Sequence, residues 1–292
     1  MFADLHLHTH FSAGTFSPEE VATLGQRHGF AALALSDDDT VEGCVRMAQA
    51  CAANGLEFIT GSELTAEVDG HELHLLAYGV DITHPRLLSE LGRFQEVRQN
   101  RIREMVGCLN KRGIPLPAEA VFRLANCRAP GRPHVARALV QAGFCGDLDE
   151  AFDRFLKKGK PAWVPKCKMS GAEAVALIHE AGGLAVMAHP GLNRTDEFIP
   201  ELLEAGLDGI ECFHSRHSTA MAEHYLVIAD KYRLLVTGGS DCHGMNKGQP
   251  LLGTIKLPYR HVEQLKTRIA AQRAKAGLAP APADAETVAR NE

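Results

Sequence analysis

The sequence lacks several features that would assign it to particular protein classes. No run approaches the ~20 apolar residues of a membrane-spanning helix, and the N-terminus lacks the charged-then-apolar pattern of a secretory signal. The eight cysteines form no C-x-x-C pair and lie mostly among apolar or helical neighbours. We therefore expect reduced thiols in a cytoplasmic protein that makes no membrane contact.

The chain also lacks any strong excess of charge. Its net charge is -5 over 292 residues, which argues against a broad surface that coats nucleic acid, although a local basic groove is compatible with it. We find no internal repeat. The length allows one barrel or about two domains of roughly 150 residues.

What the chain does contain is a series of short apolar runs that predict strands. These runs lie at about 2–7, 31–36, 56–62, 73–79, 184–188, 208–213 and 234–240. Most are continuous rather than alternating, as expected for parallel strands buried on both faces. Helical patterns lie between many of them, and Ser17-Pro18-Glu19-Glu20 carries the residues of a capping box. The pattern predicts an α/β fold, an irregular seven-stranded (β/α) barrel, one strand short of the usual eight.

One interval interrupts this alternation. Residues 87–165 contain a long charged helical pattern, several prolines and no convincing strand. We therefore predict an all-helical insertion domain that lies over the open face of the barrel. The barrel would be discontinuous, formed by residues 1–86 and 166–270, and the Ala- and Pro-rich residues 271–292 would form a tail.

Metal-ligand residues lie in or directly after most of the predicted strands. Alternate residues of a strand share a face, so two histidines in the first run point the same way. The carboxyl ends of barrel strands are where an active site is assembled from residues far apart in sequence. Imidazole and carboxylate ligands together suit Zn, Mn or Fe(II), and a shared carboxylate can bridge two ions. The residues that predict such a centre are His6, His8, Glu63, His74, His189, Asp241 and His243.

Five segments resemble, in order, the successive motifs of the PHP (polymerase and histidinol phosphatase) family. They are Asp4–Thr9, Leu35–Thr40, Gly61–Glu63, Ala188–Pro190 and Gly239–His243. The segments Gly131–Ala136 and Gly159–Pro165 resemble the subgroup of this family that has a helical insertion. That subgroup includes 3',5'-nucleoside bisphosphate phosphatases and a 5'-to-3' exoribonuclease acting on short RNA.

The resemblance implies three sets of metal ligands. His6, His8, Glu63 and Asp241 match the first set; Glu63, His134 and His189 match the second, with His74 near the cluster. The third set would include His243, but Ala13 replaces a ligand and Asp38 stands where the family has histidine. The resemblance implies two or three ions, Mn²⁺ first and Zn²⁺, Fe²⁺ or Mg²⁺ as alternatives. Our hypothesis is that Ala13 impairs catalysis.

The reaction implied by the resemblance is removal of the 3'-phosphate from a nucleoside 3',5'-bisphosphate by metal-bound hydroxide, with His189, His243 and Asp38 at the reaction centre. A second phosphate would bind basic residues of the insertion, first Arg132 and then Lys160, although these residues also fit a solvated basic face.

Further candidates for substrate contacts are His134, which also matches the second ligand set, and three residues outside the ligand sets. These three are Arg216, His217 and Trp163, the last of which can stack on a base or simply pack in a loop. Three alternatives remain open: an exonuclease on short 5'-phosphorylated RNA, a histidinol phosphate phosphatase, and a non-catalytic metal-binding accessory module. No obligate protein partner is evident.

Overall fold

The computed structural model describes residues 1–166, 169–193 and 196–279. The N-terminal part alternates strands with two helices and ends in three consecutive strands. Its elements are β1 (Phe2–Asp4), α1 (Pro18–Arg27), β2 (Phe30–Ala34), α2 (Cys44–Ala53), β3 (Glu57–Ile59), β4 (Gly61–Val68) and β5 (His71–Tyr78). Helix α1 begins with the predicted capping box, in which Ser17 Oγ accepts from Glu20 N at 3.2 Å and Glu20 Oε2 accepts from Ser17 N at 2.7 Å.

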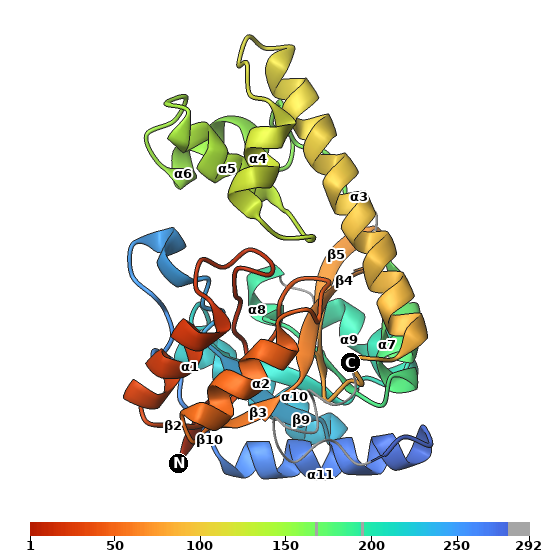
Figure 1. Cartoon of the computed structure of the whole chain (residues 1–292). Coiled ribbons are helices and arrows are strands. Elements are labelled where there is room, and N and C mark those ends of the chain that lie inside the picture. The colour runs from red at the N-terminus through yellow and green to blue at the C-terminus, as the bar shows by residue number, and fades with distance from the viewer. Residues whose placement is uncertain (167–168, 194–195, 280–292) are drawn as a thin grey trace.

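The next part of the chain is helical. Its elements are α3 (Pro85–Asn110), α4 (Ala118–Ala125), α5 (Arg132–Gln141), α6 (Leu148–Ala151) and the π-helical turn η1 (Phe152–Leu156). Helix α3 starts beside the sheets and rises away from them, and the shorter helices pack against its far half (Figure 1). This packing has a hydrophobic core of its own, which includes Ile102, Met105, Leu109, Val135 and Leu139.

The C-terminal part returns to strands and helices. Its elements are β6 (Met169–Ser170), α7 (Gly171–Glu180), β7 (Leu184–Met187), α8 (Pro190–Asn193), η2 (Asp196–Phe198), α9 (Ile199–Glu204), β8 (Gly209–His214), α10 (Thr219–Tyr232), β9 (Leu235–Gly239), η3 (Gly244–Lys247), β10 (Leu257–Pro258) and α11 (Arg260–Lys275). Each of the seven predicted apolar runs overlaps at least one of the strands β1 to β5 and β7 to β9, and the run 56–62 covers β3 and the start of β4. The two-residue strands β6 and β10 are additions that the sequence pattern did not predict.

The strands form two mixed sheets. One has the order β10-β1-β2-β3 and the other β6-β4-β5-β7-β8-β9. Isolated bridges join Leu7 to Cys242 and Asp38 to Glu63, and Leu5 N donates to Gly238 O at 3.1 Å. These links bring the ends of β1, β2, β4 and β9 together, so residues from both sheets reach a common place.

One pairing departs from the expected parallel arrangement. Strands β4 and β5 pair antiparallel over their whole length, and β5 pairs antiparallel with β7. The cause is local, since Asp69 and Gly70 connect β4 to β5 with φ values of 48° and 76°. Two successive positive φ values are what a tight two-residue hairpin turn requires, and Asp-Gly is a preferred pair for it. The sequence carried this signal between two apolar runs.

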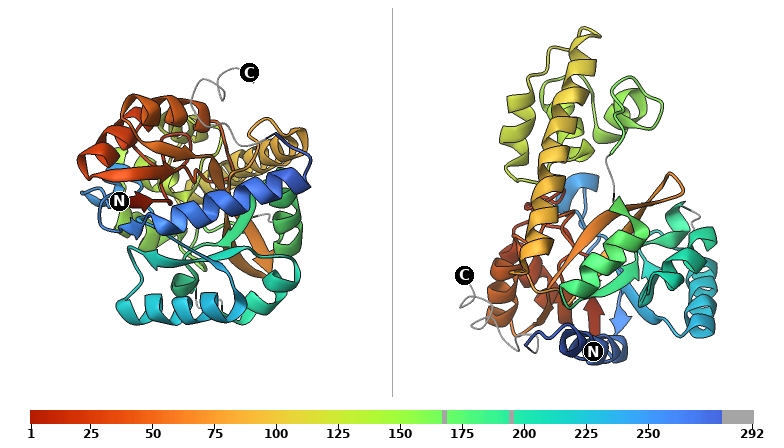
Figure 2. Two further views of the ribbon diagram at one scale, coloured as in Figure 1. Left: turned by 90° about the horizontal axis from the view of Figure 1, so that it is seen from below. Right: turned by 90° about the vertical axis from the view of Figure 1, so that its right-hand side faces the viewer.

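Helix α11 covers one end of the sheets (Figure 2). Val262, Leu265 and Ile269 are buried there, in a core cluster shared with β1, β2 and β7. The predicted tail boundary at 271 is therefore wrong, because α11 continues to Lys275 and Arg273 Nη1 donates to Gly79 O at 3.2 Å. The rest of the predicted tail, 280–292, lies outside the described residues.

None of the helices in the described part of the chain combines the length and the apolar composition that crossing a bilayer requires.

Candidate metal centre

Seven metal-ligand side chains lie close together, five of them just after strand ends and two within strands. His6 and His8 follow β1, His189 follows β7, and Asp241 and His243 follow β9. Glu63 comes from the first half of β4 and His74 from β5. His6, His8, Glu63 and His189 are all buried, at 0%, 1%, 4% and 7% exposure. Burial on this scale requires partners for each polar group.

The ligand atoms fall into overlapping groups, each compact enough for one ion. Four sets of three residues have their ligand atoms within 4.8 Å of one another: His6, His8 and Asp241; His6, Glu63 and His189; His8, Asp38 and His243; and His6, Glu211 and His214. Because His6 and His8 are shared between sets, the sets form one cluster rather than separate sites. The cluster contains seven of the nine predicted ligands, Asp38 among them, and lacks only His74 and His134.

Several of these ligand atoms have no hydrogen-bond partner although they are buried. They are His6 Nε2, His8 Nε2, His74 Nε2, His189 Nδ1 and His214 Nε2. An unpaired buried ring nitrogen is costly, and a metal ion bound there would remove that cost. The donor set of imidazoles and carboxylates therefore fits a divalent transition-metal ion.

Hydrogen bonds behind two of the histidines fix which ring nitrogen faces the cluster. Ser12 Oγ donates to Asp37 Oδ1 at 2.6 Å and lies 3.5 Å from His8 Nδ1. Glu211, from the middle of β8, lies 3.0 Å from His6 Nδ1. In both cases the oxygen is available only as an acceptor, so Nδ1 carries the proton and Nε2 keeps a lone pair for a metal.

The charges of the cluster are mutually stabilised. Burial alone would raise the pKa of Glu63, but the nearby His74, His189 and His6 hold it well below its ordinary value. The pKa of Asp241 is likewise well below normal, since His243 and His6 outweigh its burial. Burial lowers the pKa of His6, but Glu211 and Asp241 raise it well above its ordinary value. Without metal, the cluster therefore retains protons that an ion would have to displace.

Backbone strain is concentrated at the same place. Six non-glycine residues of the described chain have positive φ, and three of them are Asp39 (48°), His189 (29°) and Asp241 (54°). L-residues rarely adopt this region, so the surrounding structure must hold each of them there. At Asp241 the hydrogen bond from its N to His6 O, at 2.9 Å, ties β9 to β1 and aims the carboxylate at both histidines.

The two positions that depart from the family pattern have different surroundings. Ala13 is buried at 5% exposure, and its carbonyl oxygen accepts from Asn246 Nδ2 at 2.8 Å. Its methyl group offers no ligand atom. Asp38 Oδ1 instead accepts from Arg98 Nη2 at 3.0 Å, a contact with helix α3. Burial would raise the pKa of Asp38, but Arg98 and His8 hold it below its ordinary value.

His74 and His134 stand apart from the four groups of the described residues. His74 Nδ1 lies 2.8 Å from Glu63 Oε1, so it contacts a ligand of the cluster. His134 is in the first turn of α5, where its Nδ1 accepts from Gly131 N at 3.0 Å and its Nε2 lies 3.9 Å from Cys127 Sγ. Burial and Arg137 lower the pKa of His134 to about 3, so the ring is neutral. Its ligand role remains a prediction.

The predicted substrate-binding residues differ from one another in exposure and in their contacts. Arg216 and Lys160 are exposed, and Trp163 is half-buried, with its N donating to Lys160 O at 3.0 Å. Both ring nitrogens of His217 contact the backbone: Nδ1 lies 3.0 Å from Cys212 O, and Nε2 accepts from Gly191 N at 3.3 Å. Arg132 lies close enough to Arg101 for its charge, together with burial, to lower the pKa of Arg101 to about 10. Arg132 itself is half-buried, whereas Arg101 is buried.

The sequence analysis missed several residues that lie at the centre or at its edge. Glu211 is a carboxylate inside the apolar run 208–213, which was a usable signal. Arg98 and Arg101 are hidden among the many charges of α3, and only the fold shows that they are buried. Lys166 is one of several basic residues that the sequence shows between 157 and 166, and only the fold shows that its Nζ contacts Thr65 Oγ1 of β4 at 2.5 Å.

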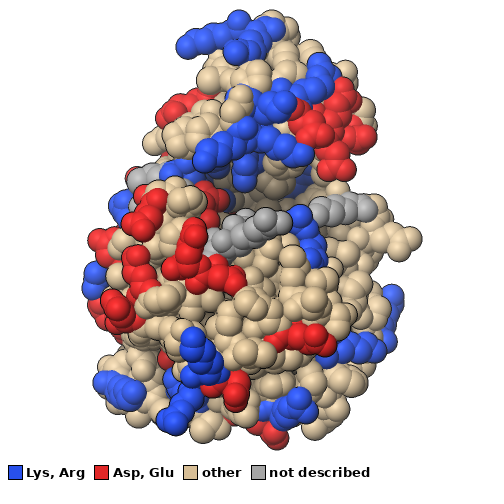
Figure 3. All heavy atoms as spheres, turned by 180° about the vertical axis from the view of Figure 1, so that it is seen from behind, with Lys and Arg blue, Asp and Glu red and all other residues tan. Residues whose placement is uncertain are grey.

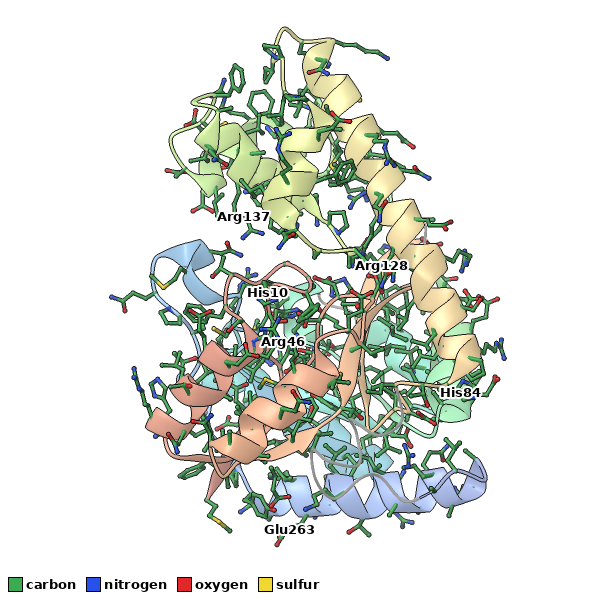
Figure 4. All side chains as sticks on the ribbon, viewed as in Figure 1. His10, Arg46, His84, Arg128, Arg137 and Glu263 are labelled. Carbon is green, nitrogen blue, oxygen red and sulfur yellow. The ribbon has the colours of Figure 1, made fainter. Side chains whose placement is uncertain are left out.

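A hollow lies between the helical part and the lower body of the molecule (Figure 3). Figure 3 shows Lys and Arg side chains gathered along the edge of the helical part that overhangs the lower body. In Figure 4, Arg137 extends below α5 and His10 stands on the loop opposite, while Arg128 lies where the two parts meet. A small anion that reaches the ligand cluster would therefore also meet positive charge from above.

Comparison with known proteins agrees with this geometry. A family model described as PHP domain matches residues 4–113. The chain is 34% identical over 251 residues to a 3',5'-nucleoside bisphosphate phosphatase of Chromobacterium violaceum, covering 84% of this chain and 88% of that protein. It is 31% identical over 247 residues to the 5'-3' exoribonuclease Rnm of Escherichia coli, covering 82% and 84%. A crystal structure described as a metal-dependent phosphoesterase from Bifidobacterium adolescentis superposes with a TM-score of 0.85 at 31% identity, over 91% of this chain and 96% of that one.

Proposed function

This chain belongs to the PHP family, and from that premise we propose that it is a phosphatase that removes the 3'-phosphate of nucleoside 3',5'-bisphosphates and leaves the 5'-nucleotide. The family supports a metal-dependent hydrolase. The single observation that carries the proposal is the shared cluster of buried ligand atoms around His6 and Glu63, with cations above it.

We propose that two Mn²⁺ ions bind, one that would be held by His6, His8 and Asp241 and one that would be held by Glu63 and His189. Divalent ions at such sites neutralise phosphate oxygens and lower the pKa of bound water. The chain supplies the fixed geometry, since Glu63 Oε1 lies 3.0 Å from His189 Nε2 and Glu63 Oε2 lies 3.5 Å from His8 Nε2.

Proton transfer is assigned to His243. Its Nδ1 lies 3.0 Å from Asp241 O and donates to this carbonyl, which leaves Nε2 as the free basic atom. Burial and the nearby His8 lower the pKa of His243, so the ring can be neutral at physiological pH. His243 also belongs to the group with Asp38, so the same nitrogen is either a ligand or a base, not both at once.

The second phosphate is assigned to the cations at the boundary between α3 and the sheets. Arg101 Nε donates to Val164 O at 2.9 Å, which leaves its two Nη groups for an anion, and Arg132 lies beside it. Lys166 is in the chain segment that returns from the helical part, and burial together with Arg98 lowers its pKa. Arginine can bind two phosphate oxygens at once, which suits recognition of a second phosphate.

An exonuclease acting on short 5'-phosphorylated RNA is the second candidate, and the similarity to the exoribonuclease supports it. Both reactions need the same ligand cluster and a bound 5'-phosphate. They differ in whether the scissile phosphate is terminal or joined to another nucleotide. The RNA substrate therefore needs room in the hollow for that further nucleotide, and the bisphosphate does not.

We infer that the strands of the two sheets, which arise from the seven predicted apolar runs, close into an irregular barrel and that residues 87–165 form a separate helical unit. The links from Leu7 to Cys242 and from Asp38 to Glu63 support closure, and the separate core around Ile102 and Leu139 supports the helical unit.

The test is a comparison of kcat/KM with Mn²⁺ for three substrates: adenosine 3',5'-bisphosphate, a 5'-phosphorylated RNA oligomer and histidinol phosphate. We expect the bisphosphate to be the best substrate. A higher kcat/KM for the RNA would favour the exonuclease, and activity on histidinol phosphate alone would reject the nucleotide proposal. No turnover of any substrate would favour an accessory metal-binding role.

A further inference from the structure

Asp38 differs from the other carboxylates of the cluster in what balances its charge. Among the described residues, the ion pairs of Glu63 and Asp241 are with histidines only. Asp38 instead forms an ion pair with Arg98, in which Nη2 lies 3.0 Å from Oδ1 and the arginine side chain is 5% exposed. A guanidinium remains charged at any physiological pH, so this carboxylate already has a permanent cation.

The position of Arg98 is fixed from its other side. Asp39 Oδ2 accepts from Arg98 Nε at 2.8 Å, and the same Asp39 side chain accepts from Thr65 N at 2.9 Å. One turn earlier on α3, Gln95 Nε2 donates to Asp39 O at 3.5 Å. The guanidinium is therefore held between two carboxylates of the segment after β2, which is bridged to β4 at Glu63, unlike an exposed pair whose side chains rearrange freely.

The same Asp38 is also the only carboxylate of the His8, Asp38 and His243 group. His8 and His243 stack with their ring centroids 4.1 Å apart, so the group is compact. Ala13 on the neighbouring loop adds no second carboxylate. A divalent ion bound here would share its only anionic ligand with Arg98, and the two cations would repel each other at short range.

We propose that the guanidinium of Arg98 takes the place of a metal ion beside Asp38, so that the His8, Asp38 and His243 group stays free of metal while the groups built on Asp241 and Glu63 load. The centre would then hold two exchangeable ions and one cation built into the chain. This inference rests on the proposed metal-dependent function but concerns only the number of ions and where they bind.

The test is the number of Mn²⁺ ions bound per chain, measured on metal-stripped protein by titration calorimetry and by elemental analysis after removal of free metal. The wild type should bind two ions tightly. Arg98→Met should bind three, because Asp38 becomes available, or should bind the third at least tenfold more tightly than the wild type does. Arg128→Met is the matched control, since Arg128 pairs with Glu42 at the same boundary but is 67% exposed, and it should bind two.

A second variant keeps the proposal testable if Arg98→Met does not fold. Asp38→Asn retains the size of the side chain and should still bind two ions with unchanged affinity. Loss of one ion in Asp38→Asn, or three equally tight ions in the wild type, would overturn the arginine proposal alone. A wild-type chain that binds no Mn²⁺ would overturn the proposed function and this inference with it.

Discussion

Glu211 Oε1 lies 3.0 Å from His6 Nδ1, and both side chains are fully buried. The pKa of Glu211 stays below its ordinary value despite burial, mainly because His6 is beside it. A carboxylate in this state only accepts, so His6 must donate from Nδ1 and present Nε2 to the cluster. The same carboxylate also accepts from His189 N at 2.8 Å, which connects it to a second ligand.

This relationship predicts that Glu211 controls metal affinity without binding metal. Replacing Glu211 with Met removes the acceptor, and we expect Mn²⁺ affinity to fall by about 10- to 100-fold while the protein remains folded. Glu211→Gln keeps an acceptor oxygen and should recover part of that loss. Calorimetric titration of both variants is the measurement, with Glu57→Met as an exposed control. Equal affinities in the Met and Gln variants would show that the hydrogen bond has no such role.

Metal binding should also release protons. Burial lowers the pKa of His8, but Asp241 and Glu63 raise it above its ordinary value. The pKa of His6 is well above its ordinary value. An ion must displace these protons, so Mn²⁺ affinity should decrease as the pH falls from 8 to 6. Titrations in two buffers with different ionisation enthalpies measure the protons released. Binding heats that do not depend on the buffer would contradict the prediction.

The metal-free protein should lose stability at alkaline pH. Burial lowers the pKa of His74, but Glu63 raises it from 6.5 to about 10. A raised folded-state pKa means that the stabilisation is complete below pH 6.5 and is lost as the pH rises through about 10. Urea unfolding in the presence of a chelator at pH 6, 8 and 10 should show this decline. His74→Gln should reduce the slope, and an unchanged slope would assign the effect to other groups.

The phosphate contacts can be separated from the chemistry by kinetics. Arg132→Ala and Arg101→Met should raise KM for adenosine 3',5'-bisphosphate more than for a simple phosphate monoester, because only the bisphosphate carries a second phosphate that these arginines would bind. Arg103→Met is a suitable control, since Arg103 is exposed on α3 and bonds Asn100. If KM rises equally for both substrates, the two arginines do not form a second phosphate site.

The parts of the site that could be predicted from sequence are those that follow from local pattern. His6 and His8 could be paired because alternate residues of a strand share a face, and His189 and Asp241 because they follow apolar runs. The hairpin between β4 and β5 could also have been predicted, because Asp69-Gly70 is a turn signal that the expectation of parallel strands overrode.

What could not be predicted depends on contacts between distant segments. Arg98 meets Asp38 across 60 residues, and Glu211 meets His6 across 205. In the sequence Arg98 is one of many charged residues of a long helix, and only the folded structure shows that it is buried. His134 matched a ligand position by its motif, but its Nδ1 is occupied by the backbone of Gly131, which only the turn at the start of α5 determines.

The most direct test of the proposed function is the identity of the products formed from adenosine 3',5'-bisphosphate with Mn²⁺ in ¹⁸O-labelled water. Removal of the 3'-phosphate by attack at phosphorus predicts unlabelled adenosine 5'-phosphate and inorganic phosphate carrying one ¹⁸O, with no reaction in the presence of a chelator. Formation of adenosine 3'-phosphate, or of no product at all, would contradict the account.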